Sequence, residues 1–215
     1  MTGFPIGVAH TLTGELANSH GAGIAGFTNG KIDKPTRTGG ITLLEGLRES
    51  GLIPRSVIGI QMVRGQNGAA GTGRVTLGGA DSSKFQTGAG SLVRMANQGH
   101  TGLWAVRLGD IKVNGQTVRS NLDTILDTDS GRHLWLACDH TKIPTMTFQV
   151  GSAVFTLNPV DIVGMKIGNR GLCYSLIQEL PAGRAQWNLG IPFMKAAYQI
   201  LDSDANEITL AKYAG

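Results

Sequence analysis

The stretch Ile125-Leu126-Asp127-Thr128-Asp129-Ser130-Gly131 runs from an apolar strand end into two acids and a turn. Alternate residues of an extended chain point to the same side, so we expect the carboxylates of Asp127 and Asp129 to lie together. A strand end and a tight turn would partly shield both acids from water, and a titrating pair could then donate and accept protons. The alternative is a solvated strand-to-turn junction with no chemical role.

The amino-acid composition of the whole chain indicates a β-rich protein with many turns. The 215 residues include 32 glycines and only 6% aromatic residues, and Gly, Asn and Ser interrupt the apolar runs. This length allows one large or two small domains with a real core. The net charge of +4 comes from scattered Lys and Arg, which argues against a nucleic-acid partner. No apolar run approaches the roughly 18 residues of a membrane span, so we expect no membrane partner.

Local patterns predict individual elements. Residues 41–50 have helical apolar spacing, with Gly51 placed for the C-terminal cap. A second, short helix is expected over residues 192–198, with proline in its first turn. Asn114-Gly115 is a two-residue hairpin signal. Strands or hairpins are predicted over residues 4–11, 57–63, 73–77, 103–113, 147–157 and 199–213.

Besides Ile125-Leu126-Asp127-Thr128, two stretches have a distinctive pattern: Val75-Thr76-Leu77-Gly78-Gly79-Ala80-Asp81-Ser82-Ser83-Lys84-Phe85 and Trp187-Asn188-Leu189-Gly190-Ile191-Pro192-Phe193. Together the three stretches resemble the pepsin-like aspartic protease family. In the family's catalytic motif two hydrophobic residues lead into Asp-Thr-Gly, and Asp127 and Thr128 fall on its aspartate and threonine. Residues 75–85 resemble the family's apolar strand followed by Gly-Gly, a small residue, Asp-Ser-Ser and an aromatic residue. Residues 187–193 resemble Trp-Ile-Leu-Gly-Asp-x-Phe, in which the Leu-Gly pair threads under the catalytic loop; here that pair is Leu189-Gly190.

The resemblance extends over nearly the whole chain and implies a mainly β, pepsin-like (acid protease) fold with few short helices. Residues 1–56 would be a remnant of the N-terminal lobe with one helix, and residues 57–215 a shortened C-terminal lobe. The two parts could form one compact unit. The front of the N-terminal lobe, with its own catalytic motif, has no counterpart in these residues.

The chain departs from the family's catalytic pattern in two ways. The family uses two aspartates, one as general base and one as general acid, but the Asp-Thr motif occurs here only once. Asp129 also stands where the family has glycine, and the next glycine is Gly131. We therefore expect no peptide hydrolysis by this chain alone, with Asp127, Thr128 and Asp129 as the candidate catalytic residues.

Three function classes follow from these residues. The first is a non-proteolytic protein with the pepsin-like fold whose carboxylate-lined cleft binds or transforms a small molecule or peptide. The second is one part of an aspartic endopeptidase whose second aspartate comes from another chain or a homodimer mate. The third is a structural or interaction domain. Whether the chain is an enzyme stays open, and the resemblance implies no cofactor.

The resemblance also concerns the two cysteines, Cys138 and Cys173. By themselves, two cysteines are more often two reduced core thiols than a bridge. The family's C-terminal lobe carries a disulfide around a hairpin at similar spacing, which implies a Cys138–Cys173 bridge around residues 143–157. A bridge implies an oxidising compartment, secretory or vacuolar by resemblance. No secretory signal is visible in residues 1–9 as given.

Other patterns carry weaker signals. Asp127, Asp129, His133, Asp139 and His140 lie close in sequence but lack metal-ligand spacing, so we expect no metal site. Residues 202–206 resemble the start of a calcium loop, but Glu207 occupies the glycine position, and we expect a solvated turn. Residues 21–26 match G-x-G-x-x-G without the following helix of a dinucleotide site.

Overall fold

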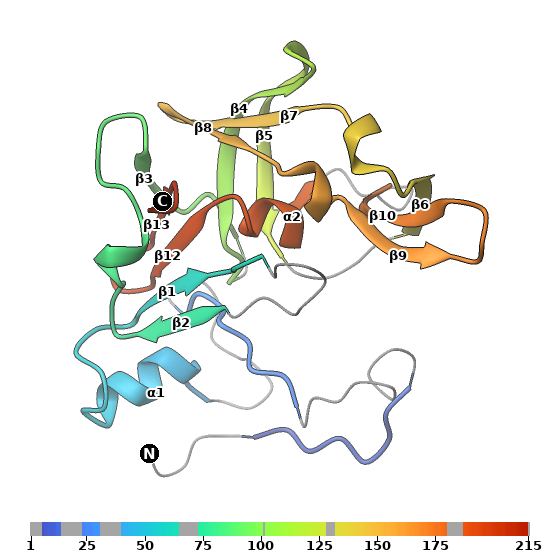
Figure 1. Ribbon diagram of the computed structural model, residues 1–215. Helices are drawn as coiled ribbons and strands as arrows, with labels where there is room; N and C mark the ends of the chain where they lie inside the picture. Colours follow the sequence, from blue (N-terminus) through green and yellow to red (C-terminus); the bar gives the residue numbers. More distant parts are fainter. Residues whose placement is uncertain are drawn as a thin grey trace.

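The computed structural model describes residues 6–13, 23–30, 40–64, 73–100, 102–127, 132–179 and 187–214. Within these residues the chain is mainly β, with two short α-helices and three single-turn 3-10 helices (Figure 1). The mainly β class predicted from the sequence is therefore confirmed. No helix in this part of the chain has the length and apolar character that a membrane crossing requires.

The helical elements are α1 (Leu43–Glu49), α2 (Ile191–Met194), η2 (Ser82–Lys84), η3 (His140–Lys142) and η4 (Pro159–Asp161). The strands are β1 (Val57–Gln61), β2 (Arg74–Leu77), β3 (Leu92–Ala96), β4 (Ala105–Val113), β5 (Gln116–Leu126), β6 (Arg132–Ala137), β7 (Met146–Val150), β8 (Ala153–Thr156), β9 (Val163–Ile167), β10 (Leu172–Glu179), β11 (Trp187–Leu189), β12 (Tyr198–Asp202) and β13 (Glu207–Ala211).

A five-stranded antiparallel sheet joins early and late parts of the chain. Its order is β2-β1-β12-β13-β3, so β1 lies between its hairpin partner β2 and the distant β12. The register pairs Val57 with Asp202 and Ile60 with Gln199. The β1–β2 and β12–β13 pairings confirm the hairpins predicted over residues 57–77 and 199–213.

The second five-stranded sheet carries the acid motif. Its order is β11-β5-β4-β7-β8. The β4–β5 turn lies at Asn114 and Gly115, whose φ angles of 49° and 80° are those of a hairpin turn with both central residues left-handed. This confirms the Asn-Gly prediction, and the β7–β8 pair confirms the hairpin within residues 147–157.

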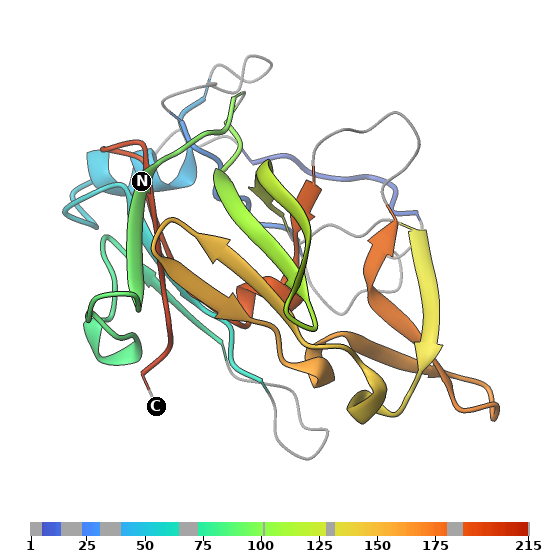
Figure 2. The same cartoon turned by 90° about the horizontal axis from the view of Figure 1, so that it is seen from above.

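The third sheet, in the order β6-β10-β9, lies at one end of the molecule in two perpendicular views (Figures 1 and 2). A disulfide joins Cys138, directly after β6, to Cys173 in β10, with their Cα atoms 5.0 Å apart. The Cys138 N–H also donates to the Gly171 carbonyl oxygen at 3.0 Å. The predicted bridge is confirmed, and it encloses the β7–β8 hairpin.

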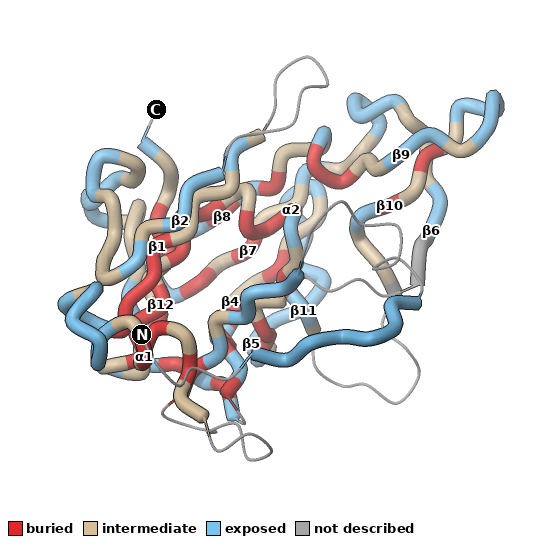
Figure 3. Tube along the Cα trace, turned by 90° about the horizontal axis from the view of Figure 1, so that it is seen from below, coloured by how far each residue is buried: buried red, intermediate tan, exposed pale blue. Residues whose placement is uncertain are grey.

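The core lies where the two larger sheets meet α2, and Figure 3 shows buried positions along β1, β12, β7, β8 and α2. Phe193 of α2 is buried, and its ring centroid lies 5.7 Å from that of Phe148 in β7 and 5.8 Å from that of Phe155 in β8. Both contacts are edge-to-face, the geometry that aromatic quadrupoles favour. The short helix thus anchors the segment that follows β11.

Helix α1 confirms the helix predicted near residues 41–50, and it begins at a capping box. The Thr42 hydroxyl accepts the Glu45 N–H, and the Glu45 carboxylate accepts the Thr42 N–H at 2.9 Å. Leu44 is buried on the inner face, and Gly51 follows with φ of +70°. Local sequence was sufficient here because caps and apolar spacing agree.

Two predicted elements are wrong. Residues 6–11 form no strand, and Ile6 and Val8 are 80% and 74% exposed, so their apolar side chains have no sheet to pack on. The helix predicted to reach Tyr198 ends at Met194, because Tyr198 begins β12 and its ring is buried beside Phe85. In both cases tertiary pairing, or its lack, overrides the local pattern.

Candidate functional site

The site is built at the end of β5, where the strand delivers Asp127. Thr124 and Ile125 are buried, whereas Leu126 and Asp127 are half-buried. The Leu126 N–H donates to the Trp104 carbonyl oxygen at 2.8 Å. The strand end is therefore held in the sheet up to the residue before the acid.

Strand β11 supports this strand end from the other side. It runs parallel to β5, with Trp187 opposite Thr124 and Leu189 opposite Leu126. The Thr124 hydroxyl donates to the Trp187 carbonyl oxygen at 2.8 Å. Parallel strands need a long crossover connection, and here the connection from β5 to β11 brings a late segment of the chain beside Asp127.

Asp127 itself makes two contacts with this segment. Its N–H donates to the Leu189 carbonyl oxygen at 3.3 Å, which continues the parallel ladder by one residue. The Asn188 side-chain amide donates to Asp127 Oδ2 at 3.4 Å. A Cβ added at Gly190 would lie 3.5 Å from the Asp127 carbonyl oxygen, so the two backbones lie close together.

The other residues of the predicted motif, Thr128, Asp129, Ser130 and Gly131, lie outside the described residues. The expected pairing of Asp129 with Asp127 thus stays a prediction. So do the support roles of Leu189 and Gly190, although both lie directly beside Asp127.

Asp139, a weaker metal-ligand candidate, serves local structure. Its carboxylate accepts the Thr141 hydroxyl at 2.6 Å and the Thr141 N–H at 3.1 Å, which caps η3. The Thr141 hydroxyl is the main cause that lowers the pKa of Asp139 below its usual value, with smaller effects of the Thr141 N–H and Lys142. Among the residues with described placement, no three His, Cys, Asp or Glu side chains converge as metal ligands would.

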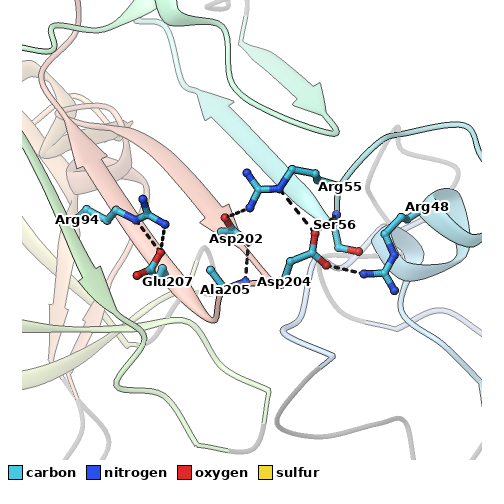
Figure 4. Close-up of polar contacts among 8 residues, drawn as sticks. All are labelled: Arg48, Arg55, Ser56, Arg94, Asp202, Asp204, Ala205 and Glu207. Carbon is cyan, nitrogen blue, oxygen red and sulfur yellow. Dashed lines mark hydrogen bonds and ion pairs between the residues drawn. The ribbon is translucent and has the colours of Figure 1, made fainter.

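The calcium-like acids at the β12–β13 turn are occupied by arginines and main-chain donors (Figure 4). Arg55 pairs with Asp202 at 2.6 Å, and Arg48 pairs with Asp204 at 2.6 Å. Asp202 is buried and also accepts the Ala205 N–H, while Asp204 accepts the Ser56 N–H. The prediction of a solvated turn is wrong, because these acids tie the turn to α1 and to the start of β1.

The sequence of this chain matches the model of a known protein family. The family model described as eukaryotic aspartyl protease matches residues 1–135 and 129–213. This chain belongs to the eukaryotic aspartyl protease family. Its mainly β architecture with few short helices is the pepsin-like fold that the resemblance implied.

Individual aspartyl proteases match the chain as well. It is 29% identical to a probable aspartic-type endopeptidase CTSD of Arthroderma benhamiae over 98% of this chain and 45% of that protein. It is 29% identical to Rhizopuspepsin-1 of Rhizopus niveus over 80% of this chain and 48% of that protein. Cathepsin E-B of Xenopus laevis is 26% identical over 80% of this chain and 49% of its own length. The chain spans about half the length of these curated relatives.

Sequence reasoning missed two polar residues beside Asp127. Thr124 is buried in β5 and holds β11, and Asn188 reaches the Asp127 carboxylate. A signal for Asn188 was present, because an amide interrupts the apolar run Trp187 to Leu189 where the family pattern has isoleucine. The sequence alone does not show that Asn188 contacts Asp127, because that contact depends on the parallel register of β5 and β11.

Proposed function

We propose that this chain uses Asp127 as an acid–base and binding carboxylate for an oxygen atom of a small-molecule or peptide ligand, and that it does not hydrolyse peptides by itself. The observation that carries this proposal is the double support of Asp127 by β11, through the Leu189 carbonyl and the Asn188 amide. A carboxylate with a fixed backbone and an oriented oxygen is suited to hold a ligand hydroxyl or carbonyl hydrate.

The lack of peptide hydrolysis follows from the chemistry. One carboxyl must accept a proton from the attacking water while a second protonates the carbonyl oxygen. The family supplies these groups from two Asp-Thr motifs, whereas this chain has one, at Asp127-Thr128. Asp129 is not an equivalent partner, because it stands at the motif's glycine position on the same loop.

A second candidate function is one part of an aspartic endopeptidase. Its second carboxylate would come from another chain or from a second copy of this one. This alternative is supported by two relatives that are named probable aspartic-type endopeptidases and are about twice as long as the matching region. Asp127 would then be one of the two catalytic acids.

The test uses the purified 215-residue chain with pepstatin, an inhibitor of aspartic proteases, as the probe. Cleavage of a denatured protein at pH 3–5 is measured for the wild type, for Asp127→Asn and for the control Asp123→Asn. Asp123 lies on the same strand, in an exposed ion pair with Arg107. Pepstatin binding is measured on the same samples by calorimetry.

We expect no cleavage by any of the three proteins. The wild type and Asp123→Asn should bind pepstatin, whereas Asp127→Asn should not. Cleavage that rises with the square of the chain concentration and is lost in Asp127→Asn would establish the homodimeric endopeptidase instead. Cleavage proportional to concentration would overturn the proposal outright. Lack of both cleavage and binding would leave the chain as a structural or interaction domain.

A further inference from the structure

We propose that Asn188 is a positioning residue that orients the carboxylate of Asp127 through its side-chain amide. This inference rests on the function proposed above. It goes beyond that function because it assigns a role to a side chain outside the acid motif, on a segment 61 residues further along the chain.

The strand geometry places the two side chains on one face. Asp127 directly follows β5, and in an extended chain its side chain lies on the same side as that of Ile125, two residues earlier. The parallel register pairs Ile125 with Asn188. Asn188 therefore lies diagonally beside Asp127, and its amide nitrogen reaches Asp127 Oδ2 at 3.4 Å.

The chemistry fixes the direction of this hydrogen bond. An ionised carboxylate only accepts hydrogen bonds, so the NH2 group of the amide must face it. The amide carries no charge and remains a donor at every pH at which the protein is folded. The distance of 3.4 Å is longer than that of an ordinary N–H···O hydrogen bond, and such contacts in unliganded sites often shorten once a ligand is bound.

The position is also distinctive in sequence. The family pattern has isoleucine between the tryptophan and the leucine of this segment, and an isoleucine side chain has no hydrogen-bond donor. The same chain replaces the motif's glycine with Asp129. The first departure places an amide donor beside the Asp127 carboxylate, where an isoleucine would offer none.

The test compares Asn188→Leu, which removes the donor, with Asn188→Ser, which is too short to reach, and Asn188→Gln, which keeps an amide. Asn188 is exposed, so these variants should keep the wild-type denaturation midpoint. We expect Asn188→Leu and Asn188→Ser to weaken pepstatin binding about fivefold to tenfold, and Asn188→Gln to restore part of it.

A double-mutant cycle separates positioning from a general structural effect. If Asn188 acts through Asp127, Asn188→Leu has no further effect on pepstatin affinity in the Asp127→Asn background. Equal losses in both backgrounds would overturn the inference, as would full binding by Asn188→Leu.

A second readout does not depend on the proposed function. The NMR signals of the Asn188 side-chain NH2 group should shift in Asp127→Asn and stay unchanged in Asp123→Asn. If the wild type fails to bind pepstatin but this shift is seen, the proposed function fails while the contact stands. If the NH2 signals are the same in all three proteins, the positioning role is refuted whatever the binding result.

Discussion

Whether an acidic side chain in this protein supports local structure or is available for chemistry depends on the groups that it contacts. Asp127 directly follows strand β5, and Asp139 follows Cys138 at the end of strand β6. Both acids were candidates for a functional site in the sequence. Asp127 meets a neighbouring strand, whereas Asp139 turns back to Thr141 and caps η3. Residue type and local sequence alone do not distinguish these two fates.

The Asp139 cap can be tested by titration. Replacement of Thr141 with valine removes the hydroxyl that chiefly lowers the pKa of Asp139, while the Thr141 N–H remains. We expect the pKa of Asp139 to rise toward the ordinary aspartate value in carbon-detected NMR. Asp81 serves as an internal control, since the Ser83 hydroxyl chiefly lowers its pKa. A change at both acids would contradict the local cause.

Tyr213 gives the fold an alkaline limit. Burial is the main cause that raises its pKa to about 12, and its hydroxyl lies 2.9 Å from the Ala197 carbonyl oxygen and accepts the Met62 N–H at 3.1 Å. The pKa of Tyr213 in the folded protein exceeds the unfolded value of about 10. The neutral Tyr213 hydroxyl therefore contributes fully to the free energy of unfolding below pH 10, and this contribution is lost as pH rises toward 12.

We therefore expect the free energy of unfolding of the wild type to fall between pH 10 and 11.5 more steeply than that of Tyr213→Phe. Denaturant titrations at several pH values measure both slopes. Parallel slopes for wild type and Tyr213→Phe would show that Tyr213 ionises alike in both states.

At the scale of elements, the small sheet depends on a covalent link. The Cys138–Cys173 bridge spans 35 residues and closes a loop that contains the whole β7–β8 hairpin. Chain-entropy reasoning assigns such a loop about 3 to 4 kcal/mol of stabilisation.

The double variant Cys138→Ser/Cys173→Ser should lower the free energy of unfolding by about 3 kcal/mol, measured in denaturant against the oxidised wild type. Reduced wild type is the matched control and should lose a similar amount. If reduction leaves the unfolding midpoint unchanged, the bridge does not constrain the unfolded chain as this reasoning assumes.

Sequence patterns succeeded for elements whose signals are local. The Thr42–Glu45 capping box and the Asn114-Gly115 turn are each determined by residues that lie within a few positions of one another. They failed for residues 6–11, which have strand-like composition but no partner strand in the described part of the chain. Asp127 was predicted because its motif is contiguous, whereas Asn188 was missed because its role depends on a register between distant strands.

At the scale of the whole molecule, a buried carboxylate joins separate parts of the fold. Asp161 in η4 is only 4% exposed, and it accepts hydrogen bonds from Arg64, which follows β1. Lys195, directly after α2, lies 3.5 Å from the same carboxylate. The segments that follow β1 and α2 are thus tied to η4, which lies between β8 and β9. The proposed boundary between residues 56 and 57 stays a prediction.

Asp161→Asn should destabilise the protein by about 2 to 3 kcal/mol, because two partly buried cations lose their counter-charge. The estimate is below that for a fully buried pair, since the Arg64 and Lys195 side chains are 37% and 27% exposed. The exposed pair Arg107–Asp123 provides the control, and Asp123→Asn should cost less than about 1 kcal/mol. Equal shifts of the denaturation midpoint would contradict a special role for Asp161.

The parallel pairing of β5 with β11 also orders events during synthesis. Asp127 emerges from the ribosome before Asn188, which lies 61 residues further along the chain and follows roughly 3 to 12 seconds later at typical translation rates. Until then the strand end that carries the acid lacks its partner on one side, and β1 likewise waits for β12. A nascent chain that ends before residue 187 would contain the acid motif but not the segment that supports it. The site therefore cannot form before residues 187–189 have been synthesised.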